Sequence, residues 1–255
     1  MTIDYNTLLP IAIHAAEQAC KEILDVYNSG DFQAEVKGDN SPLTIADKRA
    51  HYKIAEILKP TNLPLLSEEG KEVPYSERKN WEYFWMVDPL DGTKEFLKRN
   101  GEFTVNIALI HKNKPVLGVV AVPATGEIFY GAIGVGAFLK HNGKEQKLEH
   151  KKTADLKSSG LRVVASRSHM NEDTEKFINS LKDPGLVSSG SSLKFMLLIN
   201  GKADVYPRYA PTMEWDTAAA HAVVNSAGVK VLQSNSEDEL VYNKENLLNP
   251  YFICY

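Results

Sequence analysis

The sequence predicts a mixed α/β protein built from two halves. Apolar residues recur at helical spacing within the first 60 residues, which favours two N-terminal helices. Short apolar runs separated by turn residues follow between residues 103 and 140, as in an antiparallel meander. From about residue 150, strand-like and helix-like stretches alternate, which indicates an α/β arrangement. We therefore expect an N-terminal α+β half over residues 1–155 and a C-terminal α/β half over residues 156–255.

In the N-terminal half, helices are expected at residues 6–28 and 44–58, and Pro60 should end the second. The segment between them, residues 32–44, is expected to form a short hairpin or loop. Strand-like runs then follow at 63–67, 83–88, 103–110, 116–122, 127–132 and 136–140.

The C-terminal half begins after a polar stretch near residues 150–158, which is the expected boundary between the halves. Its strands and helices should alternate along the chain. The strands are expected at 161–165, 186–188, 203–207 and 229–232, and the helices at 172–181, 191–200 and 215–226.

Composition narrows the class of protein. The 255-residue chain has a net charge of −4 and no basic stripe, which counts against binding to a nucleic-acid polymer. The N-terminus lacks the pattern of a signal peptide, and no apolar run approaches the ~20 residues of a membrane span. Cys20 and Cys254 have no metal-type spacing, so free thiols in a reducing compartment are expected. We expect a cytoplasmic protein, with peripheral association at the inner membrane and the oligomeric state left open.

The stretch WEYFWMVDPLDGTKEF, residues 81–96, ends an apolar strand in two carboxylates. Asp88 is expected at the strand end, with a turn at Pro89. Buried carboxylates that converge repel each other and stay ionised only beside positive charge. Mg²⁺ is the usual cation for such hard oxygen ligands. The alternative is that Asp91 caps a helix over 92–98, but Asp88 beside it and Lys94 beyond favour a site for a metal and an anion.

Further acidic residues could belong to the same site. Glu68 and Glu69 follow a predicted strand in LLSEEG, and Asp216 stands at a helix start in EWDTAAAHAV. Capping of that helix is the alternative role of Asp216. Strand ends that carry acids within one domain can point into one cavity, which is the pattern of a metal site shared between strands.

The C-terminal half supplies groups suited to an anion. Ser191 and Lys194, in SGSSLKF, come at the start of a predicted helix, where backbone N–H groups and an ammonium favour negative charge. Capping by Ser191 is the alternative. His169, in ASRSH after a strand, either contacts a polar ligand or lies in a turn. Acids combined with hydroxyl and cationic groups point to metal-assisted phosphoryl chemistry.

These motifs resemble those of the lithium-sensitive, Mg²⁺-dependent phosphatase superfamily that includes inositol monophosphatase. DPLDGTKEF, the upstream SEE and the downstream EWDTAAAHAV carry the resemblance, which covers nearly the whole chain. Within the superfamily the chain is most similar to the bacterial CysQ-type 3'(2'),5'-bisphosphate nucleotidases, through Lys94-Glu95-Phe96, SRSH and GSSLKF. The resemblance implies a layered α/β/α/β/α sandwich, which agrees with the two predicted halves.

The resemblance also implies the metal ligands and the groups that act on water. Two or three Mg²⁺ ions would be held by the side chains of Glu68, Asp88, Asp91 and Asp216 and by the carbonyl of Leu90. Thr93, polarised by Asp47, would orient the attacking water together with Glu68.

Substrate contacts follow from the same resemblance. Backbone N–H groups of Gly92 and Thr93 would receive the scissile phosphate, and Asp216 would hold the metal nearest the leaving 3'-oxygen. The side chains that would contact the nucleotide are His169, Ser191, Lys194 and Arg208. Lys94 helps to choose the subfamily and has no assigned role.

The implied reaction is hydrolysis of the 3'-phosphate of adenosine 3',5'-bisphosphate to AMP and phosphate, by in-line attack of a metal-activated water. Phosphoadenosine phosphosulfate and inositol phosphates remain open as preferred substrates, and so does lithium sensitivity. Inositol monophosphatase activity is the nearest alternative; Lys194 and Arg208 count against it, because a second phosphate and a base need more cationic contact than inositol. An inactive metal- or nucleotide-sensing module and a structural domain whose acids are caps are alternatives of other classes.

Overall fold

The computed structural model describes residues 3–32, 35–36, 42–149, 153–165 and 170–255. Up to residue 149 the elements are α1 (Tyr5–Ser29), β1 (Glu35–Val36), β2 (Pro42–Leu43), α2 (Ile45–Leu58), the 3₁₀ turn η1 (Lys59–Thr61), β3 (Leu65–Ser67), α3 (Tyr75–Arg78), β4 (Tyr83–Asp91), α4 (Thr93–Leu97), β5 (Thr104–His111), β6 (Lys114–Val122), β7 (Glu127–Ala132), β8 (Gly136–His141) and β9 (Lys144–Leu148). After it come β10 (Arg162–Ala165), α5 (Glu172–Asn179), β11 (Gly185–Ser188), α6 (Leu193–Ile199), β12 (Tyr206–Arg208), α7 (Glu214–Ser226), β13 (Val231–Gln233) and β14 (Phe252–Cys254).

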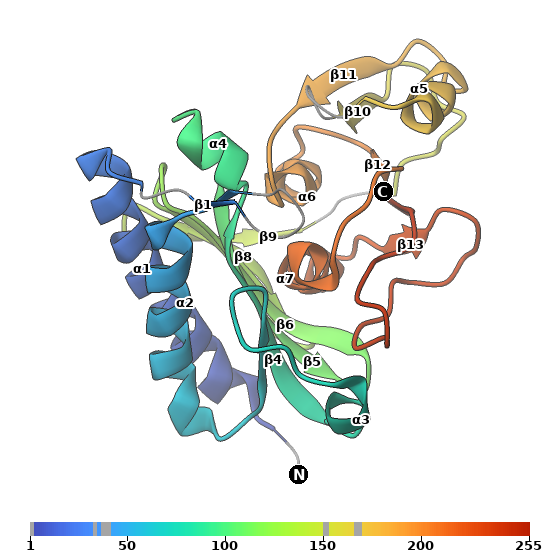
Figure 1. Ribbon diagram of the computed structural model, residues 1–255. Coiled ribbons are helices and arrows are strands. Elements are labelled where there is room, and N and C mark those ends of the chain that lie inside the picture. The colour runs from blue at the N-terminus through green and yellow to red at the C-terminus, as the bar shows by residue number, and fades with distance from the viewer. Residues whose placement is uncertain (1–2, 33–34, 37–41, 150–152, 166–169) are drawn as a thin grey trace.

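These elements stack in layers (Figure 1). Helices α1 and α2 cover one face of the large sheet, and α6 and α7 lie on its other side. The small C-terminal sheets and α5 lie beyond them. The predicted α/β/α/β/α sandwich is confirmed. Within the described ranges, no helix is long and apolar enough to cross a membrane.

The large sheet has seven strands in the order β3-β4-β5-β6-β7-β8-β9. Strands β4 to β9 pair antiparallel, which confirms the meander, and β3 joins β4 in parallel. The expected turn at Pro89 is wrong, because β4 continues to Asp91. The ladder register shifts between Asp88 and Asp91, and this irregularity accommodates a proline that has no N–H to donate.

Side-chain alternation along β4 decides which face the site occupies. Trp85 and Val87 belong to the core beneath α1 and α2, whereas Phe84 and Met86 belong to the core beneath α7. Because successive side chains point to opposite faces, Asp88 continues the face of Phe84 and Met86. The carboxylate therefore points toward α7.

Helix α7 lies close against the sheet because its inner face consists of alanines. Ala218, Ala219 and Ala222 are buried, and α7 runs directly over β6. A Cβ on Gly118 of β6 would lie 2.2 Å from the backbone oxygen of Ala219. Only glycine fits at this contact, and the close approach brings the first turn of α7 toward the end of β4.

The C-terminal half forms a parallel β10–β11 pair and an antiparallel sheet in the order β12-β14-β13. Strand β14 was not predicted, nor was β9, whose KEQKL sequence is mostly exposed. The core beneath α7 draws on both halves, since Phe84 and Val120 share it with Phe195 and Phe252. The division of the chain at residue 155 stays a prediction. Cys20 and Cys254 are free thiols, as expected.

Candidate active site

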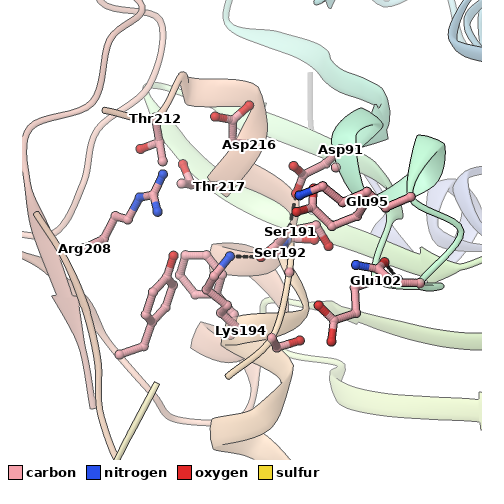
Figure 2. Close-up of a pocket in the computed structure, with 17 residues that line it drawn as sticks. Asp91, Glu95, Glu102, Ser191, Ser192, Lys194, Arg208, Thr212, Asp216 and Thr217 are labelled. Atoms are coloured by element: carbon pink, nitrogen blue, oxygen red, sulfur yellow. Dashed lines mark hydrogen bonds between the residues drawn. The ribbon is translucent and has the colours of Figure 1, made fainter. Parts of the chain in front are cut away.

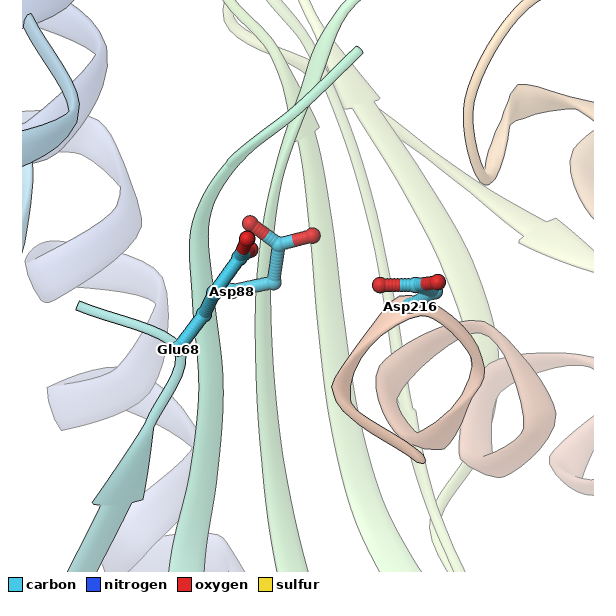
Figure 3. Close-up of side chains that lie close together, drawn as sticks. All are labelled: Glu68, Asp88 and Asp216. Atoms are coloured by element: carbon cyan, nitrogen blue, oxygen red, sulfur yellow. The ribbon is translucent and has the colours of Figure 1, made fainter. Parts of the chain in front are cut away.

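Three of the predicted acids converge between the large sheet and α7 (Figure 3). Glu68 follows β3, Asp88 lies on β4 and Asp216 lies in the first turn of α7. One carboxylate oxygen from each lies within 4.8 Å of the others. The backbone N–H of Glu68 donates to the carbonyl of Val87 at 3.1 Å, so the parallel pairing of β3 and β4 extends far enough to bring Glu68 beside Asp88.

This cluster is electrostatically unfavourable by itself. Burial raises the pKa of Asp88 well above its ordinary value, and the negative charge of Glu68 raises it further. Burial likewise raises the pKa of Asp216, and among the neighbouring charges that of Asp91 raises it most. Buried carboxylates this close together are unstable as anions unless a positive charge neutralises them. A hard divalent cation such as Mg²⁺, which prefers oxygen ligands, would do so. The residues present therefore fit the implied metal.

Asp91 lies beside this cluster at the end of β4. Its Oδ2 accepts a hydrogen bond from the backbone N–H of Ser192 at 2.7 Å. Burial raises the pKa of Asp91 to about 6, although Lys194 and the Ser192 bond act in the opposite direction. The alternative role of Asp91 as a helix cap is wrong, because Gly92 occupies the N-cap position of α4.

Asp216 bonds to the start of its own helix and also belongs to the acidic cluster. It is the third residue of α7, and its Oδ2 accepts from the backbone N–H of Met213 at 2.9 Å. That bond satisfies a donor at the helix start. The same carboxylate takes part in the acidic cluster, so capping orients Asp216 without removing it from the site.

Thr93 and Asp47 are in contact, as expected. The Thr93 hydroxyl lies 3.3 Å from Asp47 Oδ1 and 3.3 Å from the Leu90 carbonyl, both of which are acceptors. Asp47 Oδ2 in turn accepts from the Thr44 N–H at 2.8 Å and the Thr44 hydroxyl at 2.6 Å. A hydroxyl has one proton and two lone pairs. Thr93 therefore donates within the protein and keeps a lone pair to accept a hydrogen bond from water.

Gly92 makes the turn after β4 possible. Its φ of 90° lies in the left-handed region, and a Cβ at this position would lie 3.0 Å from the Glu102 carbonyl oxygen. The turn brings the backbone of residue 92 to the wall of a pocket.

That pocket has a volume of about 340 Å³ and lies between α4, α6 and the start of α7 (Figure 2). It brings together six residues predicted to contact metal or substrate, namely Asp91, Gly92, Ser191, Lys194, Arg208 from β12 and Asp216. Two of its buried polar atoms, Ser191 Oγ and Arg208 Nε, have no hydrogen-bond partner among the described residues. Unpartnered buried donors are costly, so both are suited to a polar ligand.

Lys194 is the most enclosed cation of the pocket, at 7% exposure. Its Nζ donates to the Ser191 carbonyl at 3.0 Å. Burial lowers the pKa of Lys194 to about 8, although Asp91 counteracts this. An anion beside the ammonium would raise this pKa and stabilise the charged form. Ser191 does not cap α6, which begins at Leu193 with Ser192 at its N-cap.

The pocket does not account for two of the residues that the sequence singled out. His169 lies outside the described residues. Lys94 is exposed on α4 and does not line the pocket.

The pocket also contains residues that the sequence did not single out. These are Glu95, Lys98, Asn100, Glu102, Ser189, Gly190, Ser192, Phe195, Tyr206, Thr212 and Thr217. Glu95 and Ser192 lie inside motifs already noted, next to predicted site residues, so the sequence could have indicated that they line the same pocket. Thr212 precedes the α7 motif by a few residues and could have been found in the same way.

Comparison with known proteins finds relatives along nearly the whole chain. The profile of the inositol monophosphatase family matches residues 4–251. The 3'(2'),5'-bisphosphate nucleotidase CysQ of Salmonella typhimurium is 41% identical over 240 residues, covering 93% of this chain and 95% of that protein. The protein of the same name from Escherichia coli K12 is 42% identical over 243 residues, covering 93% and 95%.

Solved structures give the same result. The crystal structure of CysQ from Bacteroides thetaiotaomicron, described as a bacterial member of the inositol monophosphatase family, has a TM-score of 0.88 at 45% identity and covers 99% of this chain and 98% of its own. A staphylococcal inositol monophosphatase-1 has a TM-score of 0.81 at 18% identity, covering 100% and 91%, and so shares the fold. With a profile match along nearly its whole length and relatives above 40% identity, the chain belongs to the inositol monophosphatase family.

Proposed function

We propose that this chain is a Mg²⁺-dependent 3'(2'),5'-bisphosphate nucleotidase that removes the 3'-phosphate of adenosine 3',5'-bisphosphate, giving AMP and phosphate. One observation carries the proposal: the acidic cluster reaches, through Asp216, a pocket with a cationic wall formed by Lys194 and Arg208. Asp216 belongs to both the cluster and the pocket, and Lys194 and Arg208 line the same cavity. The relatives named as such nucleotidases support the choice of activity.

The metal site in this proposal uses the acids that converge on α7. Glu68, Asp88, Asp91 and Asp216 would hold two or three Mg²⁺ ions, together with the carbonyl of Leu90. Bound Mg²⁺ neutralises phosphate charge, acidifies water and stabilises the charge that develops in the transition state. Burial, together with repulsion from neighbouring acids, raises the pKa values of Asp88 and Asp216, which supports this use because a cation beside the carboxylates would stabilise their charged forms.

The chain's own contribution to the chemistry is alignment of water. Thr93 donates to Asp47 or the Leu90 carbonyl, which leaves its oxygen as an acceptor. A water that donates to Thr93 and to Glu68 would keep a lone pair directed at phosphorus. The bond from water to phosphorus would form as the bond from phosphorus to the 3'-oxygen breaks, in line; the attacking water would give up a proton to Glu68 or to solvent, and the leaving 3'-oxygen would take one up from solvent. Backbone N–H groups of Gly92 and Thr93 would hold the phosphate oxygens during this displacement.

The cationic wall is the basis for choosing a nucleotide bisphosphate over an inositol phosphate. Lys194 and Arg208 face the pocket that contains Asp91 and Asp216, and Ser191 adds an unpartnered hydroxyl. A substrate with a second phosphate and a base would engage these groups, whereas inositol 1-phosphate would leave them unused. His169 remains part of this proposed substrate site.

The test is a substrate comparison with purified protein and Mg²⁺. We expect kcat/KM for phosphate release to be highest for adenosine 3',5'-bisphosphate or phosphoadenosine phosphosulfate, and lower for 3'-AMP, inositol 1-phosphate and fructose 1,6-bisphosphate. Arg208→Met should reduce the ratio of kcat/KM for adenosine 3',5'-bisphosphate to kcat/KM for 3'-AMP. Arg162→Met is the matched control, because Arg162 pairs with Asp204 outside the pocket. A preference of the wild-type protein for inositol 1-phosphate would overturn the proposal.

A further inference from the structure

Three polar side chains form a closed hydrogen-bonded ring beneath the pocket. Thr104 Oγ1 and Ser192 Oγ lie 2.8 Å apart, and Ser192 Oγ lies 2.8 Å from Asn106 Oδ1. Asn106 Nδ2 donates to Thr104 Oγ1 at 3.3 Å, which completes the ring. Their exposures are 0%, 1% and 2% for Thr104, Asn106 and Ser192. Such a network in a buried position is favourable only when every member is satisfied.

The ring fixes the direction of each hydrogen bond. Ser192 has one hydroxyl proton, and it goes to the Asn106 carbonyl oxygen, which can only accept. Thr104 must then donate to Ser192, while Thr104 accepts from the Asn106 amide. Each side chain gives one hydrogen bond and takes one, so removal of either hydroxyl breaks two of the three bonds and leaves one donor and one acceptor of the remaining pair unsatisfied.

The ring connects two separate parts of the site. Thr104 and Asn106 lie on β5 directly opposite Asp91 and Asp88 on β4. Ser192 belongs to the loop before α6, and its backbone N–H donates to Asp91 Oδ2 at 2.7 Å. Ser191 and Lys194 flank Ser192 on the same segment, and both line the pocket.

We propose that the Thr104–Asn106–Ser192 ring is a positioning device that fixes Asp91 and the anion-binding segment 191–194 relative to each other. Thr104 and Asn106 do not line the pocket, so they act through Ser192. The ring holds the Ser192 N–H on Asp91, and it holds Ser191 and Lys194 at the pocket wall. Metal binding at Asp91 and anion binding at the segment therefore favour the same arrangement, and each strengthens the other. The inference rests on the metal-binding role of Asp91 in the proposed function.

Thr104 offers a matched set of variants. Thr104→Val keeps the shape of the side chain and removes the hydroxyl, whereas Thr104→Ser keeps the hydroxyl. Ser192→Ala breaks the ring from the other side and retains the backbone N–H that contacts Asp91. Thr174→Val is the control, because Thr174 is a buried threonine of α5, away from the pocket, whose hydroxyl donates to Asn171 at 2.7 Å.

The primary measurement is the Mg²⁺ concentration at half-saturation, taken from the rise in melting temperature with added MgCl₂ and no substrate. Loss of a residue that orients a metal ligand typically weakens metal binding 10–100-fold. We expect an increase of about tenfold for Thr104→Val and Ser192→Ala, and less than about twofold for Thr104→Ser and Thr174→Val. At saturating Mg²⁺, KM for adenosine 3',5'-bisphosphate should also rise more than kcat falls in the two ring-breaking variants.

A purely structural ring gives a different result. Thr104→Val would then melt at a lower temperature and titrate with Mg²⁺ like the wild-type protein, which would overturn the inference. If Thr104→Val does not fold, Ser192→Ala decides by the same titration. If the melting temperature of the wild-type protein does not rise with Mg²⁺, the proposed function and this inference are both contradicted. If the wild-type protein responds and both ring-breaking variants titrate at the same Mg²⁺ concentration, only the inference is contradicted.

Discussion

Replacing Asp91 with asparagine should stabilise the protein when no metal is bound. Asp91 Oδ2 accepts from the Ser192 N–H, and an asparagine oxygen can accept the same bond. The substitution therefore removes a charge from the buried acidic site while keeping the shape and the hydrogen bond. The same loss of charge should abolish turnover and most of the stabilisation by Mg²⁺.

The magnitude follows from the pKa of Asp91. Burial raises this pKa from 3.8 to about 6, and each unit corresponds to about 1.4 kcal/mol. The ionised carboxylate therefore destabilises the folded protein by up to about 3 kcal/mol, and contact with solvent in the pocket reduces this to about 1–3 kcal/mol. The penalty is complete above pH 6 and is lost as pH falls toward 3.8, so the contribution of Asp91 makes metal-free wild-type protein more stable at pH 5.5 than at pH 8.

Thermal melting in EDTA at pH 8 tests this prediction. For a chain of this size, 1 kcal/mol corresponds to roughly 2–4 °C, so Asp91→Asn should melt several degrees above the wild-type protein. The difference should shrink at pH 5.5. Asp4→Asn is the control, because Asp4 is an exposed cap of α1 and asparagine caps equally well. A lower melting temperature for Asp91→Asn at pH 8 would show that this carboxylate stabilises the fold by itself, as the structural-domain alternative requires.

Three further changes address other parts of the site. Thr93→Val removes the hydroxyl beside Asp47, and kcat for phosphate release should fall by about 10²–10³ at an unchanged melting temperature; a fall below threefold would contradict the alignment of water. Gly92→Ala places a Cβ 3.0 Å from the Glu102 carbonyl at a φ of 90°, and denaturant titration should show a loss of about 1–3 kcal/mol in unfolding free energy; no loss would mean that the turn relaxes. Lys194→Met should raise KM about tenfold or more at pH 7. Because the pKa of Lys194 is about 8, wild-type KM should rise above pH 8 and that of the variant should not.

The sequence was sufficient to predict that Asp88 and Glu68 belong together. Glu68 comes directly after one apolar run and Asp88 at the end of another, and the structure pairs the strands that these runs form in parallel. Asp216 was harder to place, because a helix start explains an aspartate equally well. Its position depends on the close packing of α7 against Gly118, a contact between distant segments that one sequence does not show.

The turn predicted at Pro89 shows where local rules fail. Proline usually ends a strand because it cannot donate to the ladder, yet β4 runs on to Asp91 through a register shift. Tertiary pairing with β5 outweighs the local preference.

In the buried Thr104–Asn106–Ser192 ring, the sequence contains a local signal but does not show the distant partner. Thr104 and Asn106 stand two residues apart in an otherwise apolar strand, which signals a shared polar face, but their partner Ser192 is 86 residues from Asn106.

The most direct measurement of the central claim is the fate of adenosine 3',5'-bisphosphate followed by ³¹P NMR. With Mg²⁺, we expect the 3'-phosphate signal to disappear while inorganic phosphate and 5'-AMP accumulate in equal amounts. With EDTA in place of Mg²⁺, the substrate should persist. Formation of 3'-AMP, or turnover that continues unchanged in EDTA, would contradict the assignment of this pocket as a Mg²⁺-dependent 3'-nucleotidase site.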